Sequence, residues 1–393
     1  MPGSLLDVVL VVAVVLFAIS GYRQGLVVGV LSFFGFFGGG FLGTQVAPPI
    51  ATQVASGASQ PLVGVAVVLA VACVGQLLSL AVGHALRRRL RWRGVRALDS
   101  AGGAVVSVVA ALLVVWLIAT PLASSGYPVV ASLIRRSVII RTVDAVVPDQ
   151  VRSLYASFRR LVDRGSFPDV YGPLSPTRVP GAAPPDAVIV NSRAVAQARP
   201  SIVKVIGMAP GCSRRLEGSG FVYAPEHVMT NAHVVAGVHR LQVQFGNQHL
   251  DGFVVLYDPD RDVAVIWVPG LRRPALQFAA PVDAGTNAVV VGFPLDGPFT
   301  ATPARVRSQQ RVRGPDIYSA RTVVRQVYSL RADVRSGNSG GPLLSAGGRV
   351  LGVVFAAAAD EPDTGFALTA GEVSSDASAA AGSTVAVSTQ TCD

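Results

Sequence analysis

Four long apolar runs in the first 120 residues constrain this chain more than any other feature. They cover residues 5–20, 25–43, 62–83 and 101–119. Each run can cross about 30 Å of hydrocarbon as a helix that rises about 1.5 Å per residue. No basic leader precedes the first run, so we expect all four to remain in the mature protein. The sequence therefore predicts a bundle of four transmembrane helices over residues 1–120.

Small residues recur four positions apart on the second run, as Gly25 with Gly29 and Gly35 with Gly39. In a membrane such pairs let helix backbones approach closely, and we expect them to serve helix packing. A pore is the alternative function. No run carries a charge near its middle, as ion and proton pathways usually do, so the packing role is favoured.

The net charge of +10 comes almost wholly from arginine, and its placement predicts the orientation of the spans. The loop after the first run carries Arg23, and the loop after the second carries no charge. The loop after the third run carries a basic block of Arg87, Arg88, Arg89, Arg91, Arg93 and Arg96. Because basic loops stay in the cytoplasm, residues beyond 120 should lie in the periplasm or extracytoplasmic space. The block is interpreted as a membrane orientation signal, so no nucleic-acid partner is expected.

Three further segments follow the spans. Residues 121–171 interleave apolar residues with arginine, which suits amphipathic helices that lie on the membrane surface or dock against the spans. Residues 172–187 are rich in Pro, Gly and Ala, which favours an extended, exposed and easily cut linker. Residues 188–393 have the mixed composition of an ordinary globular domain.

Short apolar stretches alternate with turn residues throughout this last domain. They cover residues 201–206, 220–223, 241–245, 263–268, 288–292 and 350–355. Many short strands without intervening helical periods predict an all-β barrel or sandwich.

Three motifs in the domain carry the residue types that acyl transfer by serine needs. They are TNAHVV at residues 230–235, DPDRDVAVI at 258–266 and SGNSGGP at 336–342. A serine nucleophile needs a base within hydrogen-bond reach, a carboxylate to orient that base, and backbone donors for the tetrahedral oxyanion. The motifs supply a histidine, aspartates and a serine, in that order along the chain.

In these motifs the domain resembles the trypsin-like serine proteases, and among them the bacterial HtrA branch. The resemblance implies a chymotrypsin-like double β-barrel with His233 as general base, Asp262 as its orienting carboxylate and Ser339 as nucleophile. Asp262 is preferred because it alone is followed by Val-Ala-Val, the start of a strand. Asp258 and Asp260 are expected to serve the preceding turn.

The segment around Ser339 and a later strand carry the predicted substrate contacts. Gly337 permits a tight turn, so the oxyanion hole should use the amides of Gly337 and Ser339. Asp333, six residues before Ser339, is either the base of a pocket for Lys or Arg or a surface aspartate. The strand residues expected to line the cleft and bind a peptide backbone, or else to form a plain core strand, are Val353, Val354 and Phe355.

The three cysteines suggest one disulfide. Cys73 lies in the third apolar run, whereas Cys212 and Cys392 bracket the C-terminal domain. A bond between Cys212 and Cys392 would clamp the tail to the start of the domain, and it requires an oxidising compartment. Two unrelated buried thiols are the alternative.

The four predicted spans and the predicted protease domain together indicate a multi-pass inner-membrane serine endopeptidase. The first 120 residues resemble the colicin V production family, and the combination resembles actinobacterial periplasmic proteases that work under acid or oxidative stress. This resemblance implies protein and peptide substrates in the cell envelope. The spans predict contact with the lipid bilayer, and no metal or other cofactor is expected. A further hypothesis is a signalling sheddase in which self-cleavage of the linker releases the protease. The alternative function is a membrane scaffold or transport-associated protein whose protease-like domain only binds peptides.

Overall fold

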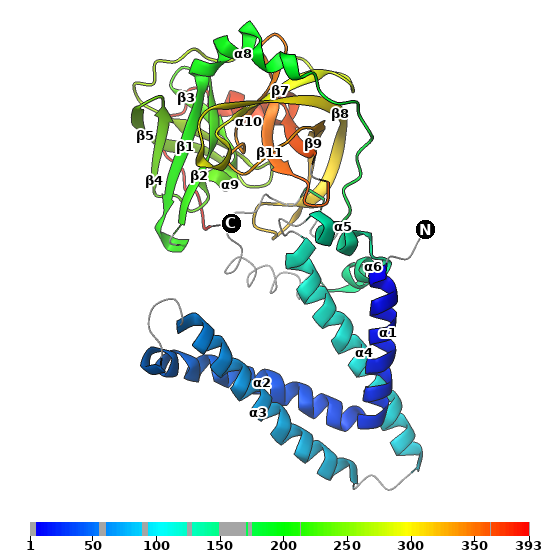
Figure 1. Cartoon of the computed structure of the whole chain (residues 1–393). Helices are drawn as coiled ribbons and strands as arrows, with labels where there is room; N and C mark the ends of the chain where they lie inside the picture. Colours follow the sequence, from blue (N-terminus) through cyan, green and yellow to red (C-terminus); the bar gives the residue numbers. More distant parts are fainter. Residues whose placement is uncertain are drawn as a thin grey trace. The chain divides into compact units, whose positions relative to one another are not determined.

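The structure is a computed structural model that describes residues 5–54, 60–88, 93–123, 128–148, 170–171, 175–212, 214–361 and 363–392. It divides into two compact units, which are considered one at a time (Figure 1). The first unit contains the long N-terminal helices together with Ser137–Asp144, and the second contains Ala119–Arg136 and Ala145–Asp393.

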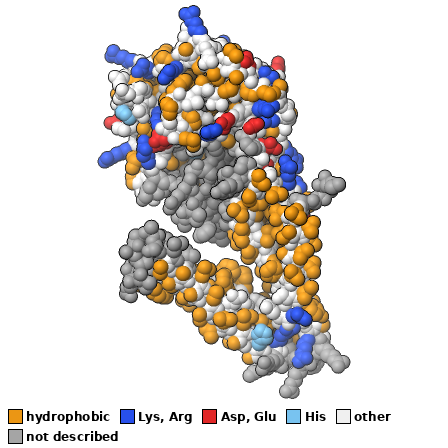
Figure 2. Space-filling view, viewed as in Figure 1, with side chains coloured by type: hydrophobic (Ala, Val, Ile, Leu, Met, Phe, Trp, Pro, Cys, Tyr) orange, Lys and Arg blue, Asp and Glu red, His pale blue; other side chains and the backbone are white. Residues whose placement is uncertain are grey.

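Four long apolar helices in the described part of the first unit confirm the predicted spans. They are α1 (Leu5–Gln24), α2 (Leu26–Val54), α3 (Gln60–Arg88) and α4 (Arg93–Ala123). Their apolar segments of 20 to 27 residues are long enough to cross a bilayer. Figure 2 shows apolar side chains gathered on the surface of these helices, whereas charged side chains are spread over the β domain. The chain is therefore a multi-pass membrane protein.

Glycine allows two pairs of these helices to pack closely. A Cβ added to Gly75 of α3 would collide with the carbonyl oxygen of Gly35 on α2, and a Cβ at Gly39 would lie 2.7 Å from the carbonyl oxygen of Val71. A Cβ added to Gly103 of α4 would likewise collide with the carbonyl oxygen of Gly21 on α1. The predicted packing role of Gly35 and Gly39 is confirmed.

The prediction for Gly25 and Gly29 is confirmed only for Gly25, because a Cβ added to Gly103 of α4 would lie 2.5 Å from the Gly25 backbone. Gly29 has no neighbouring atom within 4 Å of its Cβ position, and Gly25 has a φ of +84° at the break between α1 and α2. This left-handed turn is a conformation that glycine adopts without cost. After it, the amide of Val27 donates to the Asp99 carboxylate at 2.9 Å, and Asp99 pairs with Arg87 at 2.8 Å.

Two short helices follow the spans, α5 (Pro128–Arg136) and α6 (Val138–Val146). They occupy part of the region predicted to form amphipathic helices, whose residues 149–169 lie outside the described ones. Asp7 of α1 accepts a hydrogen bond from the amide of Val138 at 3.3 Å, at the start of α6. The buried Arg135 of α5 donates to the carbonyl oxygen of Ala123 at 3.1 Å.

The predicted linker has no helix or strand over residues 175–186, and its residues 172–174 lie outside the described ones. Hydrogen bonds nevertheless hold it against the β domain. The amide of Thr177 donates to Asp360 at 2.9 Å, and the carbonyl oxygen of Ala182 accepts from Arg331 at 2.8 Å. The amide of Asp186 donates to the side chain of Asn287 at 3.2 Å. The linker is therefore extended but attached.

The β domain consists of two closed antiparallel barrels, which confirms the predicted double-barrel fold (Figure 1). The first barrel has the strand order β1-β2-β3-β6-β5-β4 and contains β1 (Ile202–Ala209), β2 (Arg214–Ala224), β3 (His227–Thr230), β4 (Arg240–Phe245), β5 (Gln248–Asp258) and β6 (Val263–Trp267). The second has the order β10-β11-β12-β9-β8-β7 and contains β7 (Asn287–Gly292), β8 (Thr300–Pro315), β9 (Thr322–Arg331), β10 (Pro342–Ser345), β11 (Val350–Ala357) and β12 (Thr364–Thr369).

Each barrel has an apolar core, and a third cluster joins them. Val205, Val243 and Ile266 belong to the core of the first barrel. The joining cluster contains residues of both barrels, among them Phe221 of β2 and Phe355 of β11, which are fully buried. Because both barrels contribute to one apolar cluster, their mutual position is fixed by burial, and residues on the two facing sides can form a single site.

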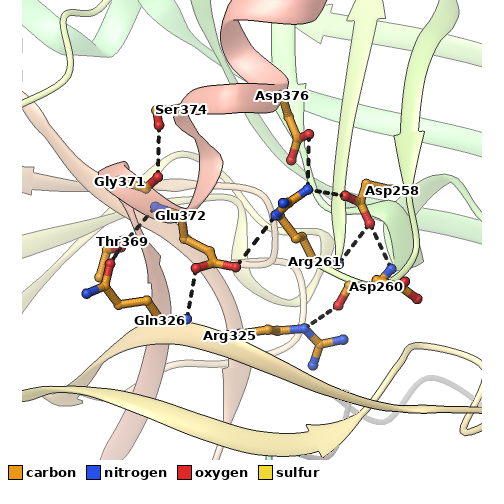
Figure 3. A network of polar contacts seen from close by, with 10 residues as sticks. All are labelled: Asp258, Asp260, Arg261, Arg325, Gln326, Thr369, Gly371, Glu372, Ser374 and Asp376. Atoms are coloured by element: carbon orange, nitrogen blue, oxygen red, sulfur yellow. Dashed lines mark hydrogen bonds and ion pairs between the residues drawn. The ribbon is translucent and has the colours of Figure 1, made fainter.

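The helix α10 (Ala370–Ala380) follows β12 and is attached to the barrels by a polar network (Figure 3). Thr369 caps the helix by accepting from the amide of Glu372 at 3.1 Å. The Glu372 carboxylate accepts from the amide of Gln326 on β9 at 3.0 Å. Arg261, before β6, pairs with Asp376 of the helix at 3.5 Å. The helix thus contacts a segment of each barrel.

The tail after α10 returns to the first barrel. The amide of Val387 donates to the carbonyl oxygen of Val254 at 2.8 Å, and the amide of Gly237 donates to that of Thr389 at 3.0 Å. Cys392 packs against the core of the first barrel and leaves no room for a Cβ at Gly237. The structure does not describe the side chain of Cys212, so the Cys212–Cys392 disulfide stays a prediction. Cys73 is a free thiol.

The network at α10 generates a prediction about stability. Burial, followed by the charge of Asp258, raises the pKa of Asp376 from its ordinary value of 3.8 to about 6. Because the folded protein binds this proton more tightly than the unfolded chain does, the folded state loses stability as the pH rises from 3.8 towards 6. We expect Asp376→Asn to raise the Tm at pH 7.5 and to leave it unchanged or lower at pH 4.5.

Differential scanning calorimetry of the detergent-solubilised chain measures this effect. Ser375→Ala, at an exposed position of the same helix, is the control and should shift the Tm equally at both pH values. A lower Tm for Asp376→Asn at pH 7.5 would show that the ionised carboxylate stabilises the fold.

Candidate active site

The imidazole of His233 and the carboxylate of Asp262 form the centre of the site. Nδ1 of His233 lies 2.8 Å from Oδ2 of Asp262 and 3.0 Å from Oδ1, and the backbone N–H of His233 donates to Oδ1 at 3.0 Å. Asp262 is fully buried, whereas 13% of the His233 side chain is exposed. The carboxylate therefore fixes the ring orientation and keeps the proton on Nδ1, which makes Nε2 the nitrogen that can accept a proton.

Local folding places His233 at the edge of the first barrel. β3 ends at Thr230, and Asn231 leads into the short helix α9 (Ala232–Val235). Val234 and Val235 of this helix are buried in the barrel core. Because its neighbours anchor the helix, His233 is held with its ring directed out of that core.

Asp262 lies at the end of the turn between β5 and β6, with a φ of +62°. This left-handed conformation is uncommon for a residue with a Cβ, and aspartate is among the residues that tolerate it. The side-chain amide of Asn231 donates to the carbonyl oxygen of Asp262 at 2.7 Å. Asn231 thus connects the two segments that carry the imidazole and the carboxylate.

The other two aspartates of this motif belong to the preceding turn, as predicted. One carboxylate oxygen of Asp258 accepts from the amides of Asp260 and Arg261, both at 2.9 Å. Asp260 directs its carboxylate to Arg321 at 2.8 Å. Both carboxylates thus bind groups of this turn and of Arg321, whereas the carboxylate of Asp262 binds His233.

Ser339 lies in a tight turn before β10 of the second barrel and is almost completely buried. Gly337 has a φ of +92° and Gly340 a φ of +81°, values that favour glycine. A Cβ at Gly340 would collide with the backbone of Ser219 and with the Thr230 hydroxyl. The glycines are therefore needed for the serine turn to approach the strand that leads to His233.

Ser219 of β2 joins the two halves of the site, and the sequence analysis missed it. Its amide donates to the carbonyl oxygen of Ser339 at 2.8 Å, and its carbonyl oxygen accepts from the Thr230 hydroxyl at 2.8 Å. Its own hydroxyl donates to the carbonyl oxygen of Gly337 at 2.6 Å and accepts from the amide of Phe293 at 2.9 Å. The flanking glycines of the segment Gly-Ser-Gly were the signal that could have drawn attention to it.

The amides of Gly337 and Ser339 have no recorded hydrogen-bond acceptor among the described residues of the chain. The carbonyl oxygen of Ser336 accepts from the amide of Leu295 at 2.7 Å. Because the N–H and C=O of a trans peptide point in opposite directions, the Gly337 amide points away from Leu295. This geometry suits an amide that donates to an incoming substrate oxygen.

Arg325 of β9 is a second residue that the sequence analysis missed. It is buried, and its Nε donates to the carbonyl oxygen of Asp260 at 2.7 Å (Figure 3). Burial lowers the pKa of its guanidinium, and the negative charge of Asp262 opposes that effect. Arg325 is thus a positive charge contributed by the second barrel near the buried carboxylate of the first.

Asp333 lies at the surface, where its carboxylate pairs with Arg335 at 2.8 Å. Both side chains are 57% exposed. A basic substrate side chain would have to displace Arg335 in order to reach this carboxylate. The preference for Lys or Arg stays a prediction.

The strand β11 carries the other three predicted substrate residues, all of which are fully buried. The amide of Val354 donates to Gly341 at 2.9 Å, and its carbonyl oxygen accepts from Gly340 at 2.8 Å. Val353 pairs with strands on both sides, whereas Phe355 lies at a bulge and has no paired residue on β12. Binding of a peptide backbone by this strand stays a prediction.

The arrangement places the serine turn against Thr230 and Asn231, which lead to the oriented imidazole, and the amides of Gly337 and Ser339 have no acceptor among the described residues. His233 and Asp262 come from the first barrel, and Ser339 comes from the second. Such a constellation supports attack of a serine hydroxyl on a carbonyl, with the imidazole as proton acceptor and the amides as oxyanion donors.

Two protein-family models match the chain. The model of the trypsin-like peptidase domain matches residues 218–353, and the model of the colicin V production protein matches residues 6–148.

Named relatives agree with both matches. Serine protease Rv3671c of Mycobacterium tuberculosis H37Rv is 41% identical over 394 residues, which cover 100% of this chain and 99% of the relative. The crystal structure of the Rv3671c protease from M. tuberculosis in its active form superposes with a TM-score of 0.54 and 51% identity, covering 56% of this chain and 96% of that one. The putative serine protease HhoB of Synechocystis is 35% identical over 161 residues, covering 38% of this chain and 37% of that protein.

The full-length match to Rv3671c brings the membrane helices and the double barrel into one family. This chain therefore belongs to the trypsin/HtrA family of serine proteases, as a membrane-anchored member with a colicin V production region before its peptidase domain.

Proposed function

We propose that this serine protease is an endopeptidase of the cell envelope that acts through a triad of Ser339, His233 and Asp262. The observation that carries the proposal is the buried Asp262 carboxylate, which accepts from both Nδ1 and the backbone amide of His233. The imidazole removes the proton of the Ser339 hydroxyl as its oxygen attacks the scissile carbonyl, and then gives that proton to the leaving amine. Water, activated by the same imidazole, hydrolyses the acyl-enzyme.

The oxyanion that forms during each attack needs hydrogen-bond donors in place beforehand. The amides of Gly337 and Ser339 serve this role in our proposal. The turn that carries them is supported by Ser219, which donates from its hydroxyl to Gly337 and from its amide to Ser339. A donor fixed in this way needs no reorganisation when the negative charge develops.

Labelling with a fluorophosphonate probe tests the triad. The full chain in detergent should react at one serine, and Ser339→Ala should not react. Ser339→Ala should also lower kcat for an unfolded protein substrate by about a million-fold, because the nucleophile is lost. Ser336→Ala, which removes another hydroxyl of the same turn, is the matched control and should keep its label. Absence of labelling in the wild type would instead favour a peptide-binding scaffold.

The membrane topology proposed for the chain places the protease unit outside the cytoplasm. Four candidate spans, with Arg23 and the basic block around Arg87 in the first and third loops, support this orientation. An extracytoplasmic site gives access to envelope proteins, and it permits the predicted disulfide between Cys212 and Cys392. The resemblance to actinobacterial periplasmic proteases extends the proposal to acid and oxidative stress.

The linker is the proposed site of self-cleavage. Its hydrogen bonds from Thr177 to Asp360 and from Arg331 to Ala182 hold it against the second barrel, so it must detach before it can bind as an extended peptide. A second copy can then cut it without refolding of the protease unit.

Fragment analysis tests self-cleavage and topology together. Cells with the wild-type chain should release a fragment whose N-terminus lies between residues 172 and 200, outside the cytoplasmic membrane. Cells with Ser339→Ala should contain only the intact chain. Asp360→Asn, which weakens the bonds to Thr177, should accelerate release several-fold. The same fragment from Ser339→Ala cells would assign the cut to another protease.

A further inference from the structure

The conformation of the predicted oxyanion segment depends on a loop that the sequence analysis did not consider. The loop between β7 and β8 contains the short helix η5 (Pro294–Asp296). In this loop the amide of Leu295 donates a hydrogen bond to the carbonyl oxygen of Ser336 at 2.7 Å. A Cβ added to Gly337 would collide with the carbonyl oxygen of Phe293, so the loop lies directly against the segment. If this loop moved away, the peptide between Ser336 and Gly337 could rotate and turn a carbonyl oxygen towards the substrate.

The loop has a backbone conformation that needs support from outside. Leu295 and Asp296 have φ values of +54° and +57°, and both residues carry a Cβ. The left-handed region is unfavourable for leucine in particular. Within the described residues, one hydrogen bond closes the turn, from the Gly297 amide to the carbonyl oxygen of Pro294 at 2.9 Å. Strained backbone of this kind persists where surrounding contacts determine it.

Lys204 of β1 supplies the outside support. Its ammonium donates to the carbonyl oxygen of Asp296 at 2.8 Å and also binds the Asp296 carboxylate. The Lys204 side chain is only 10% exposed. Lys204 is also the only lysine in a chain with 33 basic residues. A compact ammonium with three donors can bind a carbonyl and a carboxylate of one residue together, whereas the planar guanidinium of arginine imposes a fixed fork.

Lys204 and Ser219 act on the same side of the first barrel. The two residues are directly paired across β1 and β2, and such paired residues share one face of a sheet. Ser219 binds the carbonyl oxygen of Gly337 and the amide of Phe293, while Lys204 binds Asp296. One face of the first barrel therefore holds both the oxyanion segment and the loop that supports it.

We infer that Lys204 and Asp296 form a clamp between the barrels that keeps the Gly337 amide available to the oxyanion. The inference rests on the proposed triad function and adds two positioning residues to it. The clamp fixes Asp296, the turn then presents the Leu295 amide, and this amide holds the Ser336 carbonyl away from the substrate. Neither residue of the clamp touches the reacting atoms.

Kinetics of Lys204→Met in the full chain test the clamp. Methionine keeps the length of the side chain and removes its donors. We expect kcat to fall about 100-fold, the usual loss when one oxyanion donor is removed. Affinity for a peptide boronate, which forms a tetrahedral adduct with the serine, should fall by a similar factor. Binding of an ordinary peptide in the Ser339→Ala background should stay unchanged, because ground-state contacts are kept.

Two further variants distinguish the clamp from a general loss of stability. Asp296→Asn suits the left-handed backbone and keeps the carbonyl acceptor, so kcat should fall by a smaller factor, about 10-fold. Arg215→Met removes the more distant partner of Asp296, at 3.5 Å, and should leave kcat within two-fold of the wild type. If Lys204→Met fails to fold, Asp296→Asn decides the question.

The single lysine permits a readout that does not depend on activity. In the wild type, reductive methylation should modify the chain N-terminus and spare the buried Lys204, whereas in Asp296→Asn the lysine should react. If the wild-type enzyme is active and both clamp variants keep its kcat, the clamp is overturned and the proposed triad function is not. An inactive wild type would instead overturn the proposed triad function.

Discussion

The hydrogen-bonded pair of His233 and Asp262 is the interaction on which the site depends. A carboxylate that is fully buried is unfavourable unless donors surround it, and here the imidazole and a backbone amide supply them. Arg325 adds a positive charge from the other barrel. The left-handed backbone of Asp262 directs this carboxylate at the imidazole, and the amide of Asn231 holds the backbone in place.

The two barrels contribute different chemistry, and a few polar residues connect them. The first barrel carries the proposed base, His233, with the Asp262 carboxylate, and the second carries the serine turn. Ser219 reaches from the first barrel to the oxyanion segment, and Lys204 reaches the loop that supports this segment. Arg325 reaches from the second barrel to the turn of Asp260. Each of these residues is buried in the described structure. The apolar cluster brings the barrels together, and these polar contacts set the geometry at the junction.

Much of this could be predicted from the sequence, because the motifs are local. The motif around His233 and the strand after Asp262 follow from short patterns, and length and hydropathy alone reveal the spans. The strands β8 and β9 escaped prediction because arginine and glutamine interrupt their apolar alternation. The helix α10 also escaped, although Thr369 and Glu372 form the spacing of a capping box.

The contacts that tune the site could not be predicted in this way. Lys204 and Asp296 are 92 positions apart, so no periodicity or motif connects them. The break at Gly25 resembled a packing motif in sequence, and only its backbone conformation shows a turn. Long-range pairing and backbone strain produce no recognisable local sequence pattern. Catalytic residues that lie within one turn do produce such a pattern.

The most direct measurement is kcat/KM of Asp262→Asn at pH 7 in the full chain. Asparagine tolerates the left-handed backbone and keeps the size of the side chain, so the fold and the Tm should be preserved. Its amide would donate to Nδ1 and leave the imidazole in the wrong tautomer for a base. The account predicts a loss of about 10⁴-fold in kcat/KM. A variant that folds and keeps kcat/KM within 10-fold of the wild type would show that this carboxylate does not orient the catalytic base.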